Sequence, residues 1–107
     1  MEIDKILRVS QLYDFYSELL NDKQKEYIKN YYFDDLSLTE ISENFNVSKQ
    51  AVSNNIKRII LDLENFEEKL SLIKLSNERL FFYKEIKKIN GNEDISYLLD
   101  QLIKLES

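Results

Sequence analysis

Residues 37–58 have the spacing of two short helices joined by a tight turn. Ser37 and Glu40 can form a capping box, because the Ser37 hydroxyl can accept from the Glu40 N–H while the Glu40 carboxylate reaches back to the Ser37 N–H. Asn46 stands where the chain must leave the first helix in a left-handed conformation, which Asn tolerates better than most residues. Ser48 can then cap the second helix. The segment predicts a helix-turn-helix.

The second helix of this pair carries polar side chains that suit a nucleic-acid groove. Its outer face holds Lys49, Gln50, Ser53, Asn54, Lys57 and Arg58, while Val52, Ile56 and Ile59 face inward. Gln and Asn can pair bidentately with adenine, and Lys and Arg reach guanine or phosphates. Residues at the start of such a helix meet base edges, so the first four are candidate base readers and the last two are candidate phosphate contacts. The alternative is a plain packing unit with a solvated outer face.

The distribution of charge singles out the same helix. The whole chain has a formal net charge of −5, the opposite of the basic footprint expected of an autonomous nucleic-acid binder. Residues 49–61, however, contain three Lys/Arg and no Asp or Glu. We expect few phosphate contacts, and hence weak binding, unless a dimer doubles the site.

Composition narrows the class of protein. The 107 residues suffice for one small domain, and the absence of Pro together with a single Gly is typical of an all-α chain. There is no His and no Cys, which removes the usual general base, thiol nucleophile and transition-metal ligands. We therefore expect no enzyme, no catalytic residue, no metal and no cofactor. The lack of Cys, of a signal peptide and of a long apolar run predicts a cytoplasmic protein without membrane contact.

Apolar periodicity predicts helices on both sides of the central motif. Residues 4–20 and 94–105 read as amphipathic helices, and Asn21 with Gln24 forms a second candidate capping box. The clearest turn in the chain is at residues 90–92.

A heptad seam extends the recognition helix beyond any groove. Its apolar residues, at spacings of three and four, are Val52, Ile56, Ile59, Leu63, Phe66, Leu70 and Ile73. Since no Gly or Pro interrupts residues 49–90, we expect one long helix, with Ser76 or Asn77 capping any break. We expect residues 1–76 to form the helix-turn-helix domain and residues 77–107 a helical extension packing on it or on a dimer partner. Leu63, Phe66, Leu70 and Ile73 are the candidate seam for packing or for a homodimer.

The chain resembles the YlxM family of small helix-turn-helix proteins from about Leu12 to Leu72. The residues that carry the resemblance are Asp14-Phe15-Tyr16, Leu20, Lys23-Gln24, Tyr27, Tyr31-Tyr32, Asp35-Leu36-Ser37-Leu38, Glu40-Ile41, Val47-Ser48, Gln50-Ala51-Val52 and Asn55-Ile56-Lys57-Arg58. The family's motif is similar to region 4 of bacterial sigma factors, whose second helix enters the DNA major groove. Shared operons imply a link to the signal recognition particle pathway. Two residues depart from the family pattern, since Asn46 replaces the usual Gly and Ser42 the usual Ala.

Together these observations predict a helix-turn-helix regulator that binds nucleic acid, with DNA favoured over RNA. The resemblance adds signal recognition particle components as partners. The alternative is a protein-interaction module that binds the signal recognition particle GTPase or RNA polymerase without nucleic acid, which the acidic surface would favour.

Overall fold

The computed structural model describes residues 2–107, which form helices and no strand. The predicted all-α class is confirmed. The chain divides into two compact units, the first ending at Leu70 and the second spanning Ser71–Ser107. Across the described residues, no helix is both long and apolar enough to pass through a bilayer.

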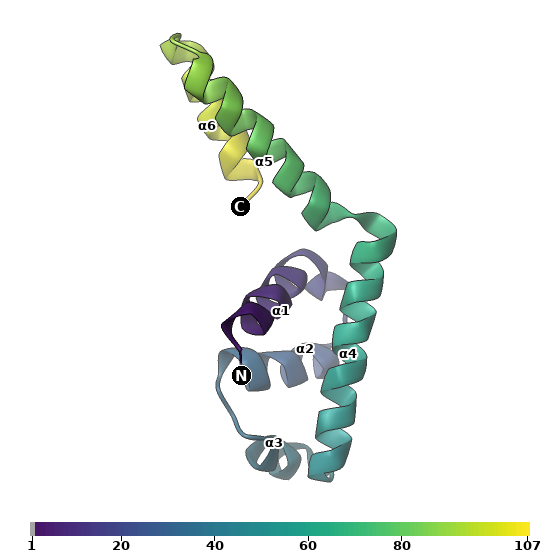
Figure 1. The fold of residues 1–107 in the computed structure, drawn as a ribbon. Helices are drawn as coiled ribbons and strands as arrows, with labels where there is room; N and C mark the ends of the chain where they lie inside the picture. The colour runs from purple at the N-terminus through teal and green to yellow at the C-terminus, as the bar shows by residue number, and fades with distance from the viewer. Residues whose placement is uncertain (1) are drawn as a thin grey trace. The chain divides into compact units, whose positions relative to one another are not determined.

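The first unit arranges three short helices against one long helix. Its elements are α1 (Ile3–Tyr16), the 3₁₀ turn η1 (Ser17–Leu19), α2 (Asp22–Ile28), the π-helical turn η2 (Lys29–Phe33), α3 (Leu38–Phe45) and α4 (Lys49–Leu70). Figure 1 shows α3 beside the start of α4, with α2 and α1 further along the same helix. Each short helix therefore covers a different stretch of α4.

The core follows the apolar seam that the sequence predicts along α4. Val52, Ile56, Ile59 and Leu63 are at most 4% exposed. The helices that cover them contribute the buried side chains Val9, Leu12, Tyr16, Tyr27, Ile28 and Ile41. Removing this apolar surface from water is the main stabilising contribution to the unit.

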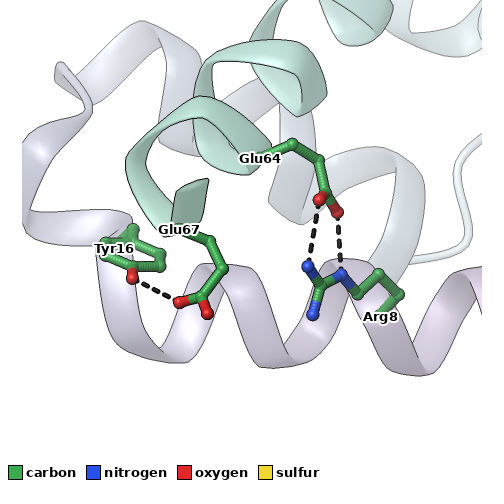
Figure 2. A network of polar contacts seen from close by, with 4 residues as sticks. All are labelled: Arg8, Tyr16, Glu64 and Glu67. Atoms are coloured by element: carbon green, nitrogen blue, oxygen red, sulfur yellow. Dashed lines mark hydrogen bonds and ion pairs between the residues drawn. The ribbon is translucent and has the colours of Figure 1, made fainter. Parts of the chain in front are cut away.

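Polar contacts fasten the second half of α4 to α1 (Figure 2). The Arg8 guanidinium donates to both carboxylate oxygens of Glu64, at 2.8 Å from Nε and 3.0 Å from Nη2. These bonds raise the pKa of Arg8. The Tyr16 hydroxyl donates to Glu67 at 2.5 Å, while its ring packs on Phe66 with centroids 6.0 Å apart. Two of the four acids in the second half of α4, Glu64 and Glu67, are thus bonded to α1.

The long helix expected from the sequence is interrupted. Helix α4 ends at Leu70, and Ser71 adopts a left-handed conformation with φ 55°. The boundary between the two units therefore lies earlier than the one expected after residue 76. Ser76 does not cap a break, since it is buried inside α5 and its hydroxyl donates to Glu106 at 2.5 Å. Neither Gly nor Pro marks the interruption, which is why the sequence did not reveal it.

The second unit is a hairpin of α5 (Leu72–Ile89) and α6 (Glu93–Leu105). Asn92 caps α6 by accepting from the N–H groups of Asp94 and Ile95. At the other end, the Arg79 guanidinium donates to Glu106 at 2.6 Å. The hydrogen bonds from Arg79 and Ser76 hold the pKa of Glu106 below its ordinary value. This contact therefore stabilises the hairpin at neutral pH and is lost as the pH falls through that lowered value.

Substitution of two leucines on α4 tests how much the buried apolar seam contributes to the stability of the first unit. Leu63 is fully buried, whereas Leu61 on the same helix is 69% exposed. We expect Leu63→Ala to lower the free energy of unfolding by about 3 kcal/mol, because it removes buried methyl groups and leaves a cavity. Leu61→Ala should change it by less than about 0.5 kcal/mol. Chemical denaturation followed by circular dichroism measures both, and equal losses would contradict the proposed core.

Candidate nucleic-acid interface

The turn between α3 and α4 has the geometry that the sequence predicts. Ser37 and Glu40 form the capping box, with both hydrogen bonds at 3.1 Å. Asn46 is left-handed, with φ 55° and ψ 46°. The Val47 N–H donates to the Ser42 carbonyl and the Asn46 N–H to the Glu43 carbonyl, which is a Schellman ending. Asn46 therefore takes the backbone conformation for which the family pattern uses Gly.

The other departure from the family pattern is also accommodated. Ser42 is 8% exposed, so the site admits only a small side chain. Its hydroxyl donates to the Thr39 carbonyl at 2.7 Å, which satisfies the buried polar group. At the start of the next helix the Ser48 hydroxyl accepts from the Ala51 N–H at 3.0 Å, as predicted. Both helices are thus fixed locally by side chains that the sequence identifies.

The six predicted contact residues all lie on α4 and away from its buried seam. Lys49, Gln50, Asn54, Lys57 and Arg58 are exposed, and Ser53 is half-buried. Gln50 and Asn54 lie one turn apart, and Gln50 Nε2 donates to Asn54 Oδ1 at 3.1 Å. Gln50 keeps a second N–H and its carbonyl oxygen, which are the donor and acceptor that adenine requires. The hydrogen bond places the two amides side by side on the exposed face of α4.

A cleft of about 220 Å³ lies between α4 and α2. Its lining residues are Asn21, Lys23, Gln24, Tyr27, Asn55, Arg58 and Ile59. Asn55 Nδ2 donates to the Tyr27 hydroxyl at 3.3 Å, and the Tyr27 ring stacks on Phe45 at 4.3 Å between centroids. This chain of contacts joins α2, α3 and α4 beside the cleft, while Lys23 and Arg58 supply its positive charge.

A smaller cleft of about 90 Å³ borders α4 at another set of residues. It is lined by Lys5, Tyr31, Tyr32, Leu38, Ser53, Ile56, Lys57 and Ile60. Tyr31 and Tyr32 meet edge to face at 5.1 Å between centroids. Burial raises the pKa of the Tyr32 hydroxyl, which keeps it protonated and able to donate. This cleft also combines one cation from α4, Lys57, with one from the N-terminal helix, Lys5.

The charges on α4 divide between its two halves. The first thirteen residues contain three Lys/Arg and no acid, whereas residues 62–70 contain four acids and Lys69. Among the described residues, Lys5, Lys23, Lys57 and Arg58 form no ion pair. The first half of α4 and its two clefts can therefore receive an anion, while the second half serves packing.

Sequence reasoning missed three residues that line the clefts. Asn55 lies on the predicted helix but was not assigned a role, and Lys5 and Lys23 come from helices outside the motif. Their proximity to α4 depends on tertiary packing, so no local pattern could reveal it.

Part of the predicted packing seam is already packed within the first unit. Leu63 is fully buried and Phe66 packs on Tyr16, whereas Leu70 is 49% exposed. Ile73 is 3% exposed and lies beyond the interruption at Ser71. The four residues therefore do not share one continuous helical face.

Comparison with known proteins finds relatives along nearly the whole chain. The family described as "Putative helix-turn-helix protein, YlxM / p13 like" matches residues 3–102. The UPF0122 protein YlxM of Bacillus subtilis is 44% identical over 110 residues, covering 99% of this chain and all of the relative. A UPF0122 protein of Bacillus licheniformis is 45% identical over 107 residues, with 99% and 100% coverage. The expected end of the resemblance near Leu72 is thus wrong, because the match extends through the α5–α6 hairpin.

Substitution of Asn46 tests the left-handed turn. We expect Asn46→Ala to lower the free energy of unfolding by about 1 kcal/mol, because a Cβ without a compensating polar group disfavours this conformation. Asn46→Gly should be neutral or stabilising. The matched control is Asn44→Ala at an exposed position in the last turn of α3, which should be neutral or slightly stabilising because Ala has the higher helix propensity. Denaturant titration distinguishes the three variants. A tolerated Asn46→Ala would contradict the turn geometry.

Proposed function

Since the chain belongs to the family of YlxM- and p13-like helix-turn-helix proteins, we propose that it binds nucleic acid through the first half of α4 and acts as a regulator. The observation that carries the proposal is the division of charge on α4. The acid-free first half exposes its polar side chains, while Glu64 and Glu67 in the acidic second half are bonded to α1. Duplex DNA is the ligand class, because a helix of this kind fits the major groove.

Base contacts are assigned to the beginning of α4. Lys49, Gln50, Ser53 and Asn54 occupy its first two turns, where the recognition helix of a helix-turn-helix meets base edges. The hydrogen bond between Gln50 and Asn54 supports joint base recognition by these two residues, since it relates the orientations of two amides that can read adenine. An ordered pair loses less conformational entropy on binding than two free side chains.

Phosphate contacts are assigned to the cations at the two clefts. Lys57 with Lys5, and Arg58 with Lys23, place paired positive charges beside the recognition helix. Such contacts position the protein on the duplex without reading sequence. The tyrosine hydroxyls and amides in the clefts add neutral donors.

The first unit has nine Lys/Arg against fourteen Asp/Glu, so its net charge of −5 opposes binding to a polyanion. We therefore expect modest affinity that depends on the few cations around α4. The family resemblance links the chain to the signal recognition particle, which makes the RNA of that particle the second ligand to test.

The experiment is fluorescence anisotropy with a random duplex DNA pool and with signal recognition particle RNA, at low and near-physiological salt. Lys57→Ala and Arg58→Ala should each weaken binding to all sequences and reduce the salt slope by about one. Gln50→Ala and Asn54→Ala should instead change which sequences are preferred, by about 1–3 kcal/mol at a preferred site, as read by selection from the pool.

Lys69→Ala is the matched control, because it removes the same charge from an exposed position in the other half of α4. It should leave binding nearly unchanged. Equal losses from Lys69→Ala and Lys57→Ala would show an effect of net charge alone and would contradict the assignment. If the wild type binds neither polymer at low salt, the protein-interaction alternative replaces the proposal.

A further inference from the structure

The α5–α6 hairpin leaves most of its large apolar side chains exposed. Only Ile73, Ser76 and Leu99 are buried in its two helices. Eleven large apolar side chains in α5 and α6 are between 38% and 87% exposed, the least exposed being Leu102 and the most exposed Ile89. Units below about 40 residues are rarely stable alone without a disulfide, a metal or an oligomer. The chain has no Cys, and no group of acidic residues in the described part could hold a metal.

The inner contact of the hairpin uses one heptad seam on each helix. On α5 the half-buried or buried positions include Ile73, Ser76, Leu80 and Tyr83, and on α6 they include Ser96, Leu99, Ile103 and, just past its end, Glu106. The spacing of three and four is that of helices packed side by side. The ion pair of Lys87 with Asp100, at 2.6 Å, borders this contact.

A second seam runs one residue earlier on both helices. It consists of Leu72, Leu75, Phe82, Ile86 and Ile89 on α5, and of Ile95, Leu98, Leu102 and Leu105 on α6. One residue turns an α-helix by about 100°. Because the two helices are antiparallel and the offset has the same sign in each, both second seams lie on the same face of the hairpin. The hairpin thus presents one broad apolar face beside its inner contact.

Two adjacent seams on each helix are what a four-helix bundle requires, since every helix there contacts two neighbours. We propose that this face packs against the same face of a second copy of the chain, so that two hairpins form a four-helix bundle. Between Leu75 and Phe82 the same spacing of three and four passes through a charged residue, Arg79, whose guanidinium is already paired with Glu106 of its own hairpin. No unpaired charge is therefore buried in the bundle.

Charge complementarity identifies a second copy as the occupant. Helix α5 contains five Lys/Arg and two Glu, whereas α6 contains three Asp/Glu and one Lys. The positive helix of one hairpin is therefore complementary to the negative helix of another. When α5 of each copy lies beside α6 of the other, one twofold axis relates the two contacts, and each brings a positive helix against a negative one. Packing α5 against α5 would instead bring two positive helices together. Six basic and six acidic residues leave Ser71–Ser107 neutral.

Neighbouring residues provide matched variants for the test. Phe82, in the second seam, is 61% exposed, and Phe81, outside both seams, is 59% exposed. Leu98 at 59% and Tyr97 at 63% form the same kind of pair on α6.

Sedimentation equilibrium of the full chain at micromolar concentration should give twice the chain mass of 12.9 kDa. Phe82→Glu and Leu98→Glu should each weaken association by at least about a hundredfold, because each buries an unpaired carboxylate. Phe81→Glu and Tyr97→Glu should remain dimeric.

Cross-linking gives an independent test, because it detects the dimer directly and does not depend on the stability of a monomeric variant. Since the chain has no Cys, Leu98→Cys combined with Phe82→Cys introduces the only thiols. A short bifunctional reagent should produce a covalent dimer from this variant and not from one carrying Phe81→Cys and Tyr97→Cys. A monomeric wild type, or equal effects of seam and control variants, would overturn the proposal and leave the face to a different protein. Loss of nucleic-acid binding would not affect the result, because the hairpin lies outside the α4 interface.

Discussion

The apolar seam of α4 is the constraint on which the first unit depends. A helix of 22 residues with one apolar stripe must have that stripe covered along its length. Helix α3 covers its start, α2 its middle and α1 its second half. Helix α1 adds polar contacts to this apolar packing, because Arg8 and Tyr16 donate hydrogen bonds to acids of α4. The first half of the same helix is left with an exposed polar surface.

This division explains how an acidic chain can present a surface for nucleic acid. The acids of α4 follow Leu61, and two of them, Glu64 and Glu67, are occupied by contacts with α1. The cations before that point have no carboxylate partner among the described residues. Affinity then depends on local arrangement rather than on net charge, and a second copy would add a second set of contacts.

Local signals predicted the motif well. The capping residues Ser37 and Ser48 and the left-handed Asn46 act within a few residues of their own position, so the sequence contains the whole interaction. The interruption at Ser71 depends instead on a left-handed serine that no local pattern marks. Lys5 and Lys23 reach α4 only through tertiary packing. The sequence pattern did not separate the two seams of the hairpin. Their heptads are offset by one residue, so together they resemble a single broad apolar surface.

Nuclear magnetic resonance would test the central claim, that one half of α4 binds nucleic acid while the other half serves packing. Backbone amide shifts of the labelled protein are followed as duplex DNA is added. The account predicts saturable shifts at Lys49, Gln50, Ser53 and Asn54, with the amides of residues 62–70 unchanged. Shifts confined to residues 62–70, or absent throughout at low salt, would contradict it.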